Sequence, residues 1–361
     1  MKHIALYIHL PFCARKCAYC DFTSFPGKTD LIPDYLNQLE NEMRASVERY
    51  GPMAAATVFL GGGTPSLLTG DQMNRLMDAV RRHFTVASDA EITSEANPGA
   101  VDAAKLRAFH AAGINRLSLG VQSFDDGLLR TLGRIHTARE AKDAVHMAAD
   151  AGFTNLSLDL MYALPGQRMN QWLDTVGTAL SLPIKHISCY SLIVENGTPM
   201  KAMVEAHPNL LPDEETAVGM QHEAAKLLRA NGFSRYEISN YALPGFESRH
   251  NQCYWRRGDY LGLGCAAHSL MYGERFANTS SLEEYLAGVR AGDVETLTER
   301  DVYEETVMLG LRTREGVDAS LLPREKLDRL VKAGLMAVKD GRAAVTEAGA
   351  DVLNAVILEF L

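Results

Sequence analysis

The pattern of apolar and polar positions divides the chain into two kinds of segment, which follow one another in turn. Short runs rich in β-branched and aromatic residues predict strands, and longer stretches with apolar positions three or four apart predict helices. The predicted strands are residues 3–8, 56–60, 91–95, 116–121, 156–160 and 186–192. The predicted helices are residues 33–50, 71–84, 102–112, 125–132, 138–151, 171–180 and 213–231. Strands that lead into helices indicate right-handed βα units around a parallel sheet, and six units would form an incomplete barrel.

The pattern changes after Gly292-Asp293. Helical runs at residues 299–311 and 323–333 precede a strand-like hairpin at 336–346 with Asp340-Gly341 at its turn, and a last helix is predicted at 348–360. This order is typical of a winged-helix-like α+β module, a shape that often binds DNA. The second helical run mixes Lys and Arg with Glu and Asp, so we favour a lid or docking domain and do not expect nucleic acid as a partner.

Length and charge narrow the class of protein. A chain of 361 residues exceeds what one compact core usually covers, so we expect a large domain and a small one. The net charge of −9 argues against a broad electrostatic contact with nucleic acid or anionic lipid. No apolar run approaches a membrane span, and the start does not resemble a signal peptide. Six cysteines in such a chain are not a secreted disulfide framework, so we expect a cytoplasmic protein.

Three cysteines lie close together near the N-terminus. Cys13, Cys17 and Cys20 form a C-x3-C-x2-C motif directly after an apolar run. Iron–sulfur clusters are held by cysteine thiolates, usually four, and three ligands leave one iron with an open position. The spacing matches no structural zinc pattern well, so we predict a cluster rather than three incidental core residues. The remaining cysteines are scattered and are interpreted as buried thiols: Cys189, Cys253 and Cys265.

Glycines and polar residues follow the predicted strands in order. In barrels of βα units, functional residues lie at the carboxyl ends of the strands. The segments concerned are Gly61-Gly62-Gly63-Thr64-Pro65, Ser94-Glu95-Ala96-Asn97-Pro98, Gly120-Val121-Gln122-Ser123 with Arg134 beyond it, and Asp159 with Leu164-Pro165-Gly166-Gln167. Each alone has the composition of a solvated loop, but their succession on neighbouring strand ends favours one shared site.

The cysteine motif, with Tyr19 directly before the third cysteine, resembles the radical S-adenosylmethionine (SAM) superfamily. The resemblance implies a three-quarter, (β/α)6 TIM-type barrel whose cysteines hold a 4Fe–4S cluster. It implies that SAM binds the fourth iron and can be split by one electron into methionine and a 5′-deoxyadenosyl radical. We therefore expect a barrel over residues 1–235, a family-specific extension over 236–292 and a winged-helix-like domain over 293–361.

Further motifs resemble the coproporphyrinogen dehydrogenase-like branch of that superfamily. They are Tyr7-Ile8-His9-Leu10-Pro11-Phe12-Cys13, G-G-G-T-P, E-x-N-P, G-V-Q-S-F and D-L-x-x-x-L-P, and the match runs from Tyr7 beyond Ser269. Carried over by position, the resemblance implies a SAM site formed by Tyr7, Tyr19, Gly62, Gly63, Thr64, Glu95, Gln122, Arg134 and Asp159.

Two departures separate the chain from the dehydrogenase itself. The dehydrogenase has a fourth cysteine two residues after the third, where this chain has Asp21-Phe22. It also has a long N-terminal extension, whereas the tyrosine of the motif falls at position 7 here. With these departures, His250-Asn251-Gln252-Cys253-Tyr254-Trp255 and the glycine-rich segment 262–269 resemble the HemW-type heme chaperones. In that family the histidine of H-N-x-x-Y-W is implicated in heme binding, so His250 is the candidate heme ligand.

The chemistry of this stretch leaves two interpretations open. Imidazole is a common axial ligand of heme iron, and aromatic rings can cover a porphyrin. A hydrogen-bonded core loop has the same composition, and the residues alone favour that structural role for His250. His268 is interpreted as structural, whereas His9, four residues before Cys13, suits either a structural role or one beside the cluster.

We expect a HemW-type protein with a 4Fe–4S cluster, SAM, and heme as its cargo. The resemblance implies acceptor hemoproteins associated with membranes as partners, and an electron donor such as flavodoxin or ferredoxin if SAM is cleaved. One alternative is an oxygen-independent coproporphyrinogen III oxidase that decarboxylates a porphyrinogen, and another is a radical SAM enzyme such as a methyl-transferring one. Asp21-Phe22 argues against the first. Turnover of SAM and a homodimeric state are left open.

Overall fold

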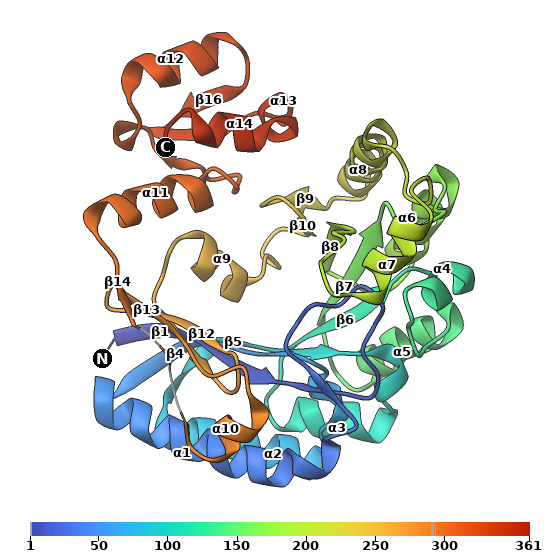
Figure 1. Cartoon of the computed structure of the whole chain (residues 1–361), viewed down its shortest axis with the longest axis vertical. Coiled ribbons are helices and arrows are strands. Elements are labelled where there is room, and N and C mark those ends of the chain that lie inside the picture. Colours follow the sequence, from blue (N-terminus) through green and yellow to red (C-terminus); the bar gives the residue numbers. More distant parts are fainter. Residues whose placement is uncertain (1, 290–291, 293) are drawn as a thin grey trace.

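The computed structural model describes residues 2–289, 292 and 294–361, and in this part of the chain a twelve-stranded sheet dominates the fold. Its centre is parallel and follows chain order (Figure 1). The central strands are β1 (Lys2–Leu10), β4 (Met53–Gly62), β5 (Thr85–Ala96), β6 (Arg116–Gln122), β7 (Asn155–Tyr162) and β8 (His186–Ser191). The six strands predicted from the sequence are therefore confirmed, although β5 begins at Thr85 rather than at Glu91.

Helices connect these strands along the outer side of the sheet, as α1, α2 and α3 show in Figure 1. The connecting helices are α1 (Ile32–Tyr50), α2 (Gly70–His83), α3 (Ala103–Ala111), α4 (Asp126–Thr131), α5 (Ala138–Asp150), α6 (Met169–Leu180), α7 (Pro199–Ala206) and α8 (Glu214–Ala230). On α1 the side chains of Tyr35, Leu39 and Met43, spaced four apart, are fully buried. This apolar stripe faces the sheet, as helical periodicity requires.

Both edges of the sheet carry strands that were not predicted. β11 (Tyr260–Leu263) pairs parallel with β1, so β1 is flanked on both sides. An antiparallel arm continues from it, formed by β12 (His268–Met271), β13 (Glu274–Ala277) and β14 (Glu295–Thr296). The opposite edge ends in antiparallel β10 (Asn240–Ala242) and β9 (Ser234–Arg235). Two- to four-residue strands carry too little periodicity to be recognised in a sequence.

Short elements hold the segments between the strands. The cysteine loop lies between β2 (Phe12–Cys13) and β3 (Phe25–Pro26), which pair with each other. Its start is hydrogen bonded to the loop after β4, where the N–H of Gly63 donates to Leu10 O at 2.9 Å and that of Thr64 to Phe12 O at 2.7 Å. The other short helices are η1 (Thr29–Leu31), η2 (Pro65–Leu67), η3 (Pro98–Ala100), η4 (Ala319–Leu321), α9 (Arg249–Trp255) and α10 (Leu282–Leu286).

The C-terminal part has a separate apolar core. Its elements are α11 (Glu299–Gly310), β15 (Val317–Asp318), α12 (Arg324–Lys332), β16 (Met336–Lys339), β17 (Arg342–Val345), α13 (Glu347–Asp351) and α14 (Leu353–Leu358), with a β15-β17-β16 antiparallel sheet. The last helix was predicted as continuous, but it breaks at Val352, whose φ of −121° lies outside the helical range. We call residues 299–361 the C-terminal module. The expected domain border at residue 293 lies outside the described residues.

A buried polar network joins α1 to the sheet. Glu42 on α1 is 4% exposed and accepts hydrogen bonds from the N–H of Gly264 at 2.9 Å and the hydroxyl of Tyr285 at 2.6 Å. The hydroxyl of Tyr35 donates to His9 O at 2.7 Å and accepts from the N–H of Cys265 at 2.9 Å. None of the described helices combines the length and apolarity that a membrane span requires.

Replacing Gly264 with alanine should destabilise the barrel strongly. Gly264 has φ of +104°, and a Cβ there would lie 2.5 Å from Tyr35 Oη. Gly273, in the β12–β13 turn, has φ of +82° with no atom within 4 Å of such a Cβ, so Gly273→Ala is the matched control. We expect Gly264→Ala to cost about 3 kcal/mol or more and Gly273→Ala about 1 kcal/mol. Urea unfolding of both variants measures the difference, and equal losses would contradict it.

Candidate functional site

The structure brings the predicted strand-end residues to one edge of the sheet. Gly62 and Gln122 end β4 and β6, Glu95 is the last residue but one of β5, and Asp159 lies on β7, the next strand. The N–H of Gly62 donates to Glu95 Oε2 at 3.1 Å. Because neighbouring parallel strands place their carboxyl ends together, residues far apart in the sequence share this edge.

The cysteine loop lies beside that edge. Cys13 is buried, and Cys17 and Cys20 are partly exposed. The hydroxyl of Thr64 donates to Cys13 Sγ at 3.5 Å, and Arg134 Nη1 donates to Cys17 Sγ at 3.4 Å. Burial raises the pKa of the Cys20 thiol, and the neighbouring Cys17 and Cys13 raise it further.

Hydrogen-bond donors directed at sulfur stabilise thiolate ligands, so this donor set fits an iron–sulfur cluster. Among the residues that the structure describes, no three His, Cys, Asp or Glu side chains are arranged to hold a metal ion. The cluster on Cys13, Cys17 and Cys20 therefore stays a prediction.

The glycines after β4 are required by the packing of the protein itself. Gly62 has φ of +107°, and a Cβ there would lie 2.4 Å from the His9 ring. A Cβ on Gly63 would lie 2.6 Å from Phe12 O. The N–H groups of both residues are hydrogen bonded within the protein, to Glu95 and to Leu10. Gly62 thus approaches His9 on β1 closely, and Gly63 approaches the start of the cysteine loop.

Two carboxyl groups share the centre of the site. Burial, together with the charge of Asp159, raises the pKa of Glu95 to about 8. Burial also raises the pKa of Asp159, although this carboxylate accepts a hydrogen bond from Ser118 Oγ at 3.2 Å. A cation bound beside Glu95 would lower that pKa again and favour the carboxylate. The pair is therefore suited to a positively charged ligand group.

The side chains of Gln122 and Arg134 both lie beside Gly120. The strand pairing is irregular between Gly120 and Gln122, and Gln122 has φ of +68°, a conformation that residues other than glycine seldom adopt. A Cβ on Gly120 would lie 3.1 Å from Gln122 Nε2 and 3.4 Å from Arg134 Nη2. Arg134 also donates to Gly120 O. Such a bulge next to a strand end is typical of functional sites because it redirects a side chain.

Tyr7 and His9, on β1, form a short hydrogen-bonded chain. His9 Nε2 lies 3.0 Å from Thr23 O, and because a carbonyl only accepts, Nε2 carries the proton. His9 Nδ1 then accepts from the hydroxyl of Tyr7 at 2.9 Å. Burial lowers the pKa of His9 and keeps the imidazole neutral. His9 therefore supports Tyr7 and the cysteine loop. Tyr19, in that loop, is partly buried beside Arg134, and burial raises its pKa.

His250 lies apart from this strand-end group. Its side chain is fully buried, with Nδ1 2.8 Å from Thr57 Oγ1 and Nε2 2.7 Å from the hydroxyl of Tyr254. Burial, reinforced by the charge of Arg116, lowers the pKa of His250 to about 3. Both ring nitrogens of the imidazole are thus engaged by side chains, and Tyr254 stands between His250 and the cavity described next.

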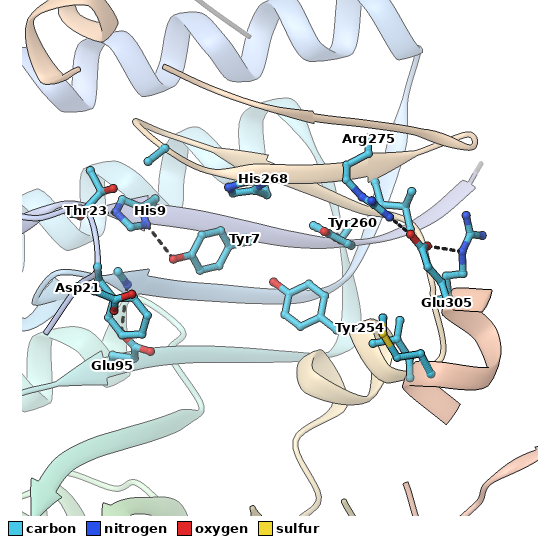
Figure 2. Close-up of a pocket in the computed structure, with 17 residues that line it drawn as sticks. Tyr7, His9, Asp21, Thr23, Glu95, Tyr254, Tyr260, His268, Arg275 and Glu305 are labelled. Atoms are coloured by element: carbon cyan, nitrogen blue, oxygen red, sulfur yellow. Dashed lines mark hydrogen bonds and ion pairs between the residues drawn. The ribbon is translucent and has the colours of Figure 1, made fainter. Parts of the chain in front are cut away.

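A cavity of about 740 Å³ extends from the strand ends, at Gly62 and Glu95, to Arg275 and Glu305 (Figure 2). Tyr7, Gly62 and Glu95 are the predicted site residues that line it. His268, which we interpreted as structural, also lines it. Three lining residues had entered the sequence analysis only through the motifs that contain them, Asp21, Phe22 and Ala266, and Tyr254 had been considered only as a porphyrin contact. The lining residues that sequence reasoning missed are Thr23, Arg257, Tyr260, Leu270, Arg275, Glu305, Met308 and Leu309. This part of the lining comes from the cysteine loop, from residues 254–275 and from α11, and no local spacing signals this convergence.

Comparison with known proteins assigns the chain to a family. Residues 7–179 match the model of the Radical SAM superfamily, and residues 297–352 match that of the HemN C-terminal domain. The solved structure of coproporphyrinogen III oxidase (HemN) from Escherichia coli, titled a radical SAM enzyme, superposes with a TM-score of 0.87 over 99% of this chain and 90% of that one. At 24% identity this likeness shows a shared fold alone, and it confirms the predicted radical SAM barrel.

Curated relatives give the finer assignment. The chain is 39% identical to the heme chaperone HemW of Bacillus subtilis (strain 168), over 86% of this chain and 84% of that protein. It is 43% identical to the heme chaperone HemW of Escherichia coli (strain K12), over 73% and 69% respectively. Identities of this size, spread across the barrel and the segments that follow it, show that the chain belongs to the HemW family of radical SAM proteins.

Proposed function

We propose that this protein binds heme and passes it to acceptor hemoproteins. The observation that carries the proposal is the cavity of about 740 Å³, in a chain whose relatives are heme chaperones. Pockets for organic ligands usually measure about 300–1,000 Å³ and combine apolar and aromatic walls with a few polar groups. Tyr254, Tyr260, Leu270, Met308 and Leu309 supply such walls here.

Cys13, Cys17 and Cys20 would hold a 4Fe–4S cluster as a resident cofactor. When bound, the cluster supplies an open iron for SAM and an electron for its cleavage. Thr64 and Arg134 would donate hydrogen bonds to the sulfurs, as they do to Cys13 and Cys17. Hydrogen bonds of this kind stabilise negative charge on sulfur and so adjust the potential of a cluster.

The contacts described above suggest a role for each residue of the predicted SAM site. Glu95 and Asp159 offer carboxylates to a cationic ligand, and Gln122 and Arg134 lie beside the same edge. Tyr7 is oriented by His9, and Gly62 orients Glu95 through its N–H. Gly63, Thr64 and Tyr19 complete the proposed set around the cysteine loop.

Replacing Glu95 should remove a pH dependence of SAM binding. With a pKa of about 8, Glu95 is mostly neutral below that pH and must lose its proton to pair with a cation. SAM affinity of the parent should therefore rise roughly tenfold or more from about pH 6.5 to about pH 8.5.

In Glu95→Gln that rise should disappear, while Glu40→Gln on the outer helix α1 should keep it. Titration of SAM followed by the paramagnetic resonance of the reduced cluster measures the affinities. A change in the protonation of SAM itself would affect the parent and both variants equally, so it cancels in the comparison. The same slope in Glu95→Gln and in the parent would remove Glu95 from the proposed site.

Heme binding and porphyrinogen oxidation can be tested on one sample. After anaerobic reconstitution, the protein should bind heme to saturation and should leave coproporphyrinogen III unconverted when a low-potential reductant is added. The physical reason is the Asp21-Phe22 pair, which lines the cavity in place of the oxidase's fourth cysteine. Failure to bind heme with cluster and SAM present would end the chaperone proposal, and robust decarboxylation would replace it with an oxidoreductase.

His250 is the proposed axial ligand, and coordination of iron would replace its hydrogen bond to Tyr254. His250→Ala should then alter the heme absorbance spectrum and weaken heme retention. Tyr254→Phe, which loses the same hydrogen bond but keeps the imidazole, should retain an imidazole-type spectrum. Melting temperatures measured alongside identify losses of stability. If folded His250→Ala keeps the parent spectrum, His250 serves only the core and the ligand lies elsewhere.

A further inference from the structure

Two arginines at the far end of the cavity share one glutamate. Arg257 follows Arg256, the C-cap of α9, whereas Arg275 lies on β13 and Glu305 on α11 of the C-terminal module. Arg257 Nε donates to Glu305 Oε2 at 2.8 Å, and Arg275 Nη2 pairs with the other carboxylate oxygen (Figure 2). All three side chains line the cavity, and Figure 2 shows Arg275 and Glu305 on the side away from Glu95.

The carboxylate of Glu305 is shared by two guanidinium groups at this end of the cavity. The side chains of Arg257 and Glu305 are each 15% exposed, so water screens them little. Arg275 has a second partner, Glu295, at 3.3 Å on the more exposed side. Within the described residues, Arg257 Nη2 is buried and has no hydrogen-bond partner. A buried N–H group without a partner is costly, and native structures seldom keep one unless a ligand, an ion or water completes it.

The end of α9 explains the backbone of Arg257. Its φ is +54°, in the left-handed region. The N–H of Arg257 donates to Tyr254 O at 3.0 Å and that of Gly258 to Cys253 O at 2.8 Å, the hydrogen-bond pattern of a Schellman cap. This helix cap fixes the point at which the Arg257 side chain, which lines the cavity, leaves the main chain.

We propose that Arg257 and Arg275 form a carboxylate-binding site for the ligand of the cavity, and that Glu305 competes with the ligand for this site. The planar guanidinium matches a carboxylate through two parallel hydrogen bonds, which makes arginine the usual partner of carboxylates. The inference rests on the proposed function, since heme carries two propionate carboxylates at one edge of an apolar ring. Leu270, Met308 and Leu309 line the cavity beside the arginines and would contact that ring.

Competition at this site connects ligand binding to the C-terminal module. Glu305 belongs to α11, whereas both arginines belong to the barrel and its extension. A ligand carboxylate that takes the guanidinium groups removes this contact between the two parts. The neighbouring pair of Arg256 with Glu315, at 2.6 Å, is about half exposed and does not line the cavity, so the ligand leaves it intact.

Two variants should have opposite effects. Arg257→Gln should weaken heme binding roughly tenfold, because a charge-assisted hydrogen bond to the propionate is lost. Glu305→Gln should strengthen heme binding several-fold, because the competing carboxylate is removed. Arg256→Gln, the matched control at the adjacent position, should bind like the parent. Heme dimethyl ester, whose carboxylates are capped, should bind all four proteins with similar affinity.

Absorbance titrations of the reconstituted full chain with heme and with its dimethyl ester measure these effects, and melting temperatures confirm that each variant folds. A structural ion pair would make both Arg257→Gln and Glu305→Gln lose affinity, for heme and ester alike, and that result would overturn the proposal. Heme binding that is unchanged in both variants would also overturn it while leaving the proposed function intact. A parent that binds neither porphyrin would contradict the function and the site together.

Discussion

The position of β1 between two parallel neighbours is the constraint on which the site depends. Its main chain is hydrogen bonded to β4 on one side and to β11 on the other, over registers that include Tyr7 and Ile8 in both cases. A strand paired on both sides cannot shift without breaking two ladders. The cysteine loop begins where this strand ends, so its start is fixed relative to the glycines after β4 and to Glu95 beyond them.

A buried arginine organises the polar interior of the barrel. Arg116 is 2% exposed, and its charge lowers the pKa of Glu95 and Asp159 against the effect of burial. The same charge lowers the pKa of His186 and His250, which burial already lowers, and keeps both imidazoles neutral. The guanidinium of Arg116 thus favours the charged form of the two carboxyl groups and the neutral form of the two imidazoles. Unlike charges attract and like charges repel, and water screens these interactions little in the interior.

The sequence predicted the parts of the fold that follow a local period. The central strands and the long helices were recognised because each repeats apolar positions over several turns or residue pairs. β9 to β14 are too short for this signal, and the break at Val352 falls inside an apolar pattern that continues on both sides. Motif spacing identified the strand-end residues, but it could not bring Arg257, Arg275 and Glu305 together, because these come from three segments that meet only in the folded chain.

The contacts of the C-terminal module with the barrel are unevenly distributed along it. Near residues 313–315 they include a β-bridge from Glu237 to Thr313, a main-chain hydrogen bond from Arg314 to Tyr236 O at 2.9 Å, and the Arg256–Glu315 pair. Glu305 lies earlier on α11, away from this group of contacts, and the further ion pairs from α8 to α13 are exposed and weak. Glu305 and residues 313–315 are therefore separate points of attachment between the module and the rest of the chain, so loss of the Glu305 contact would leave the contacts of residues 313–315 in place.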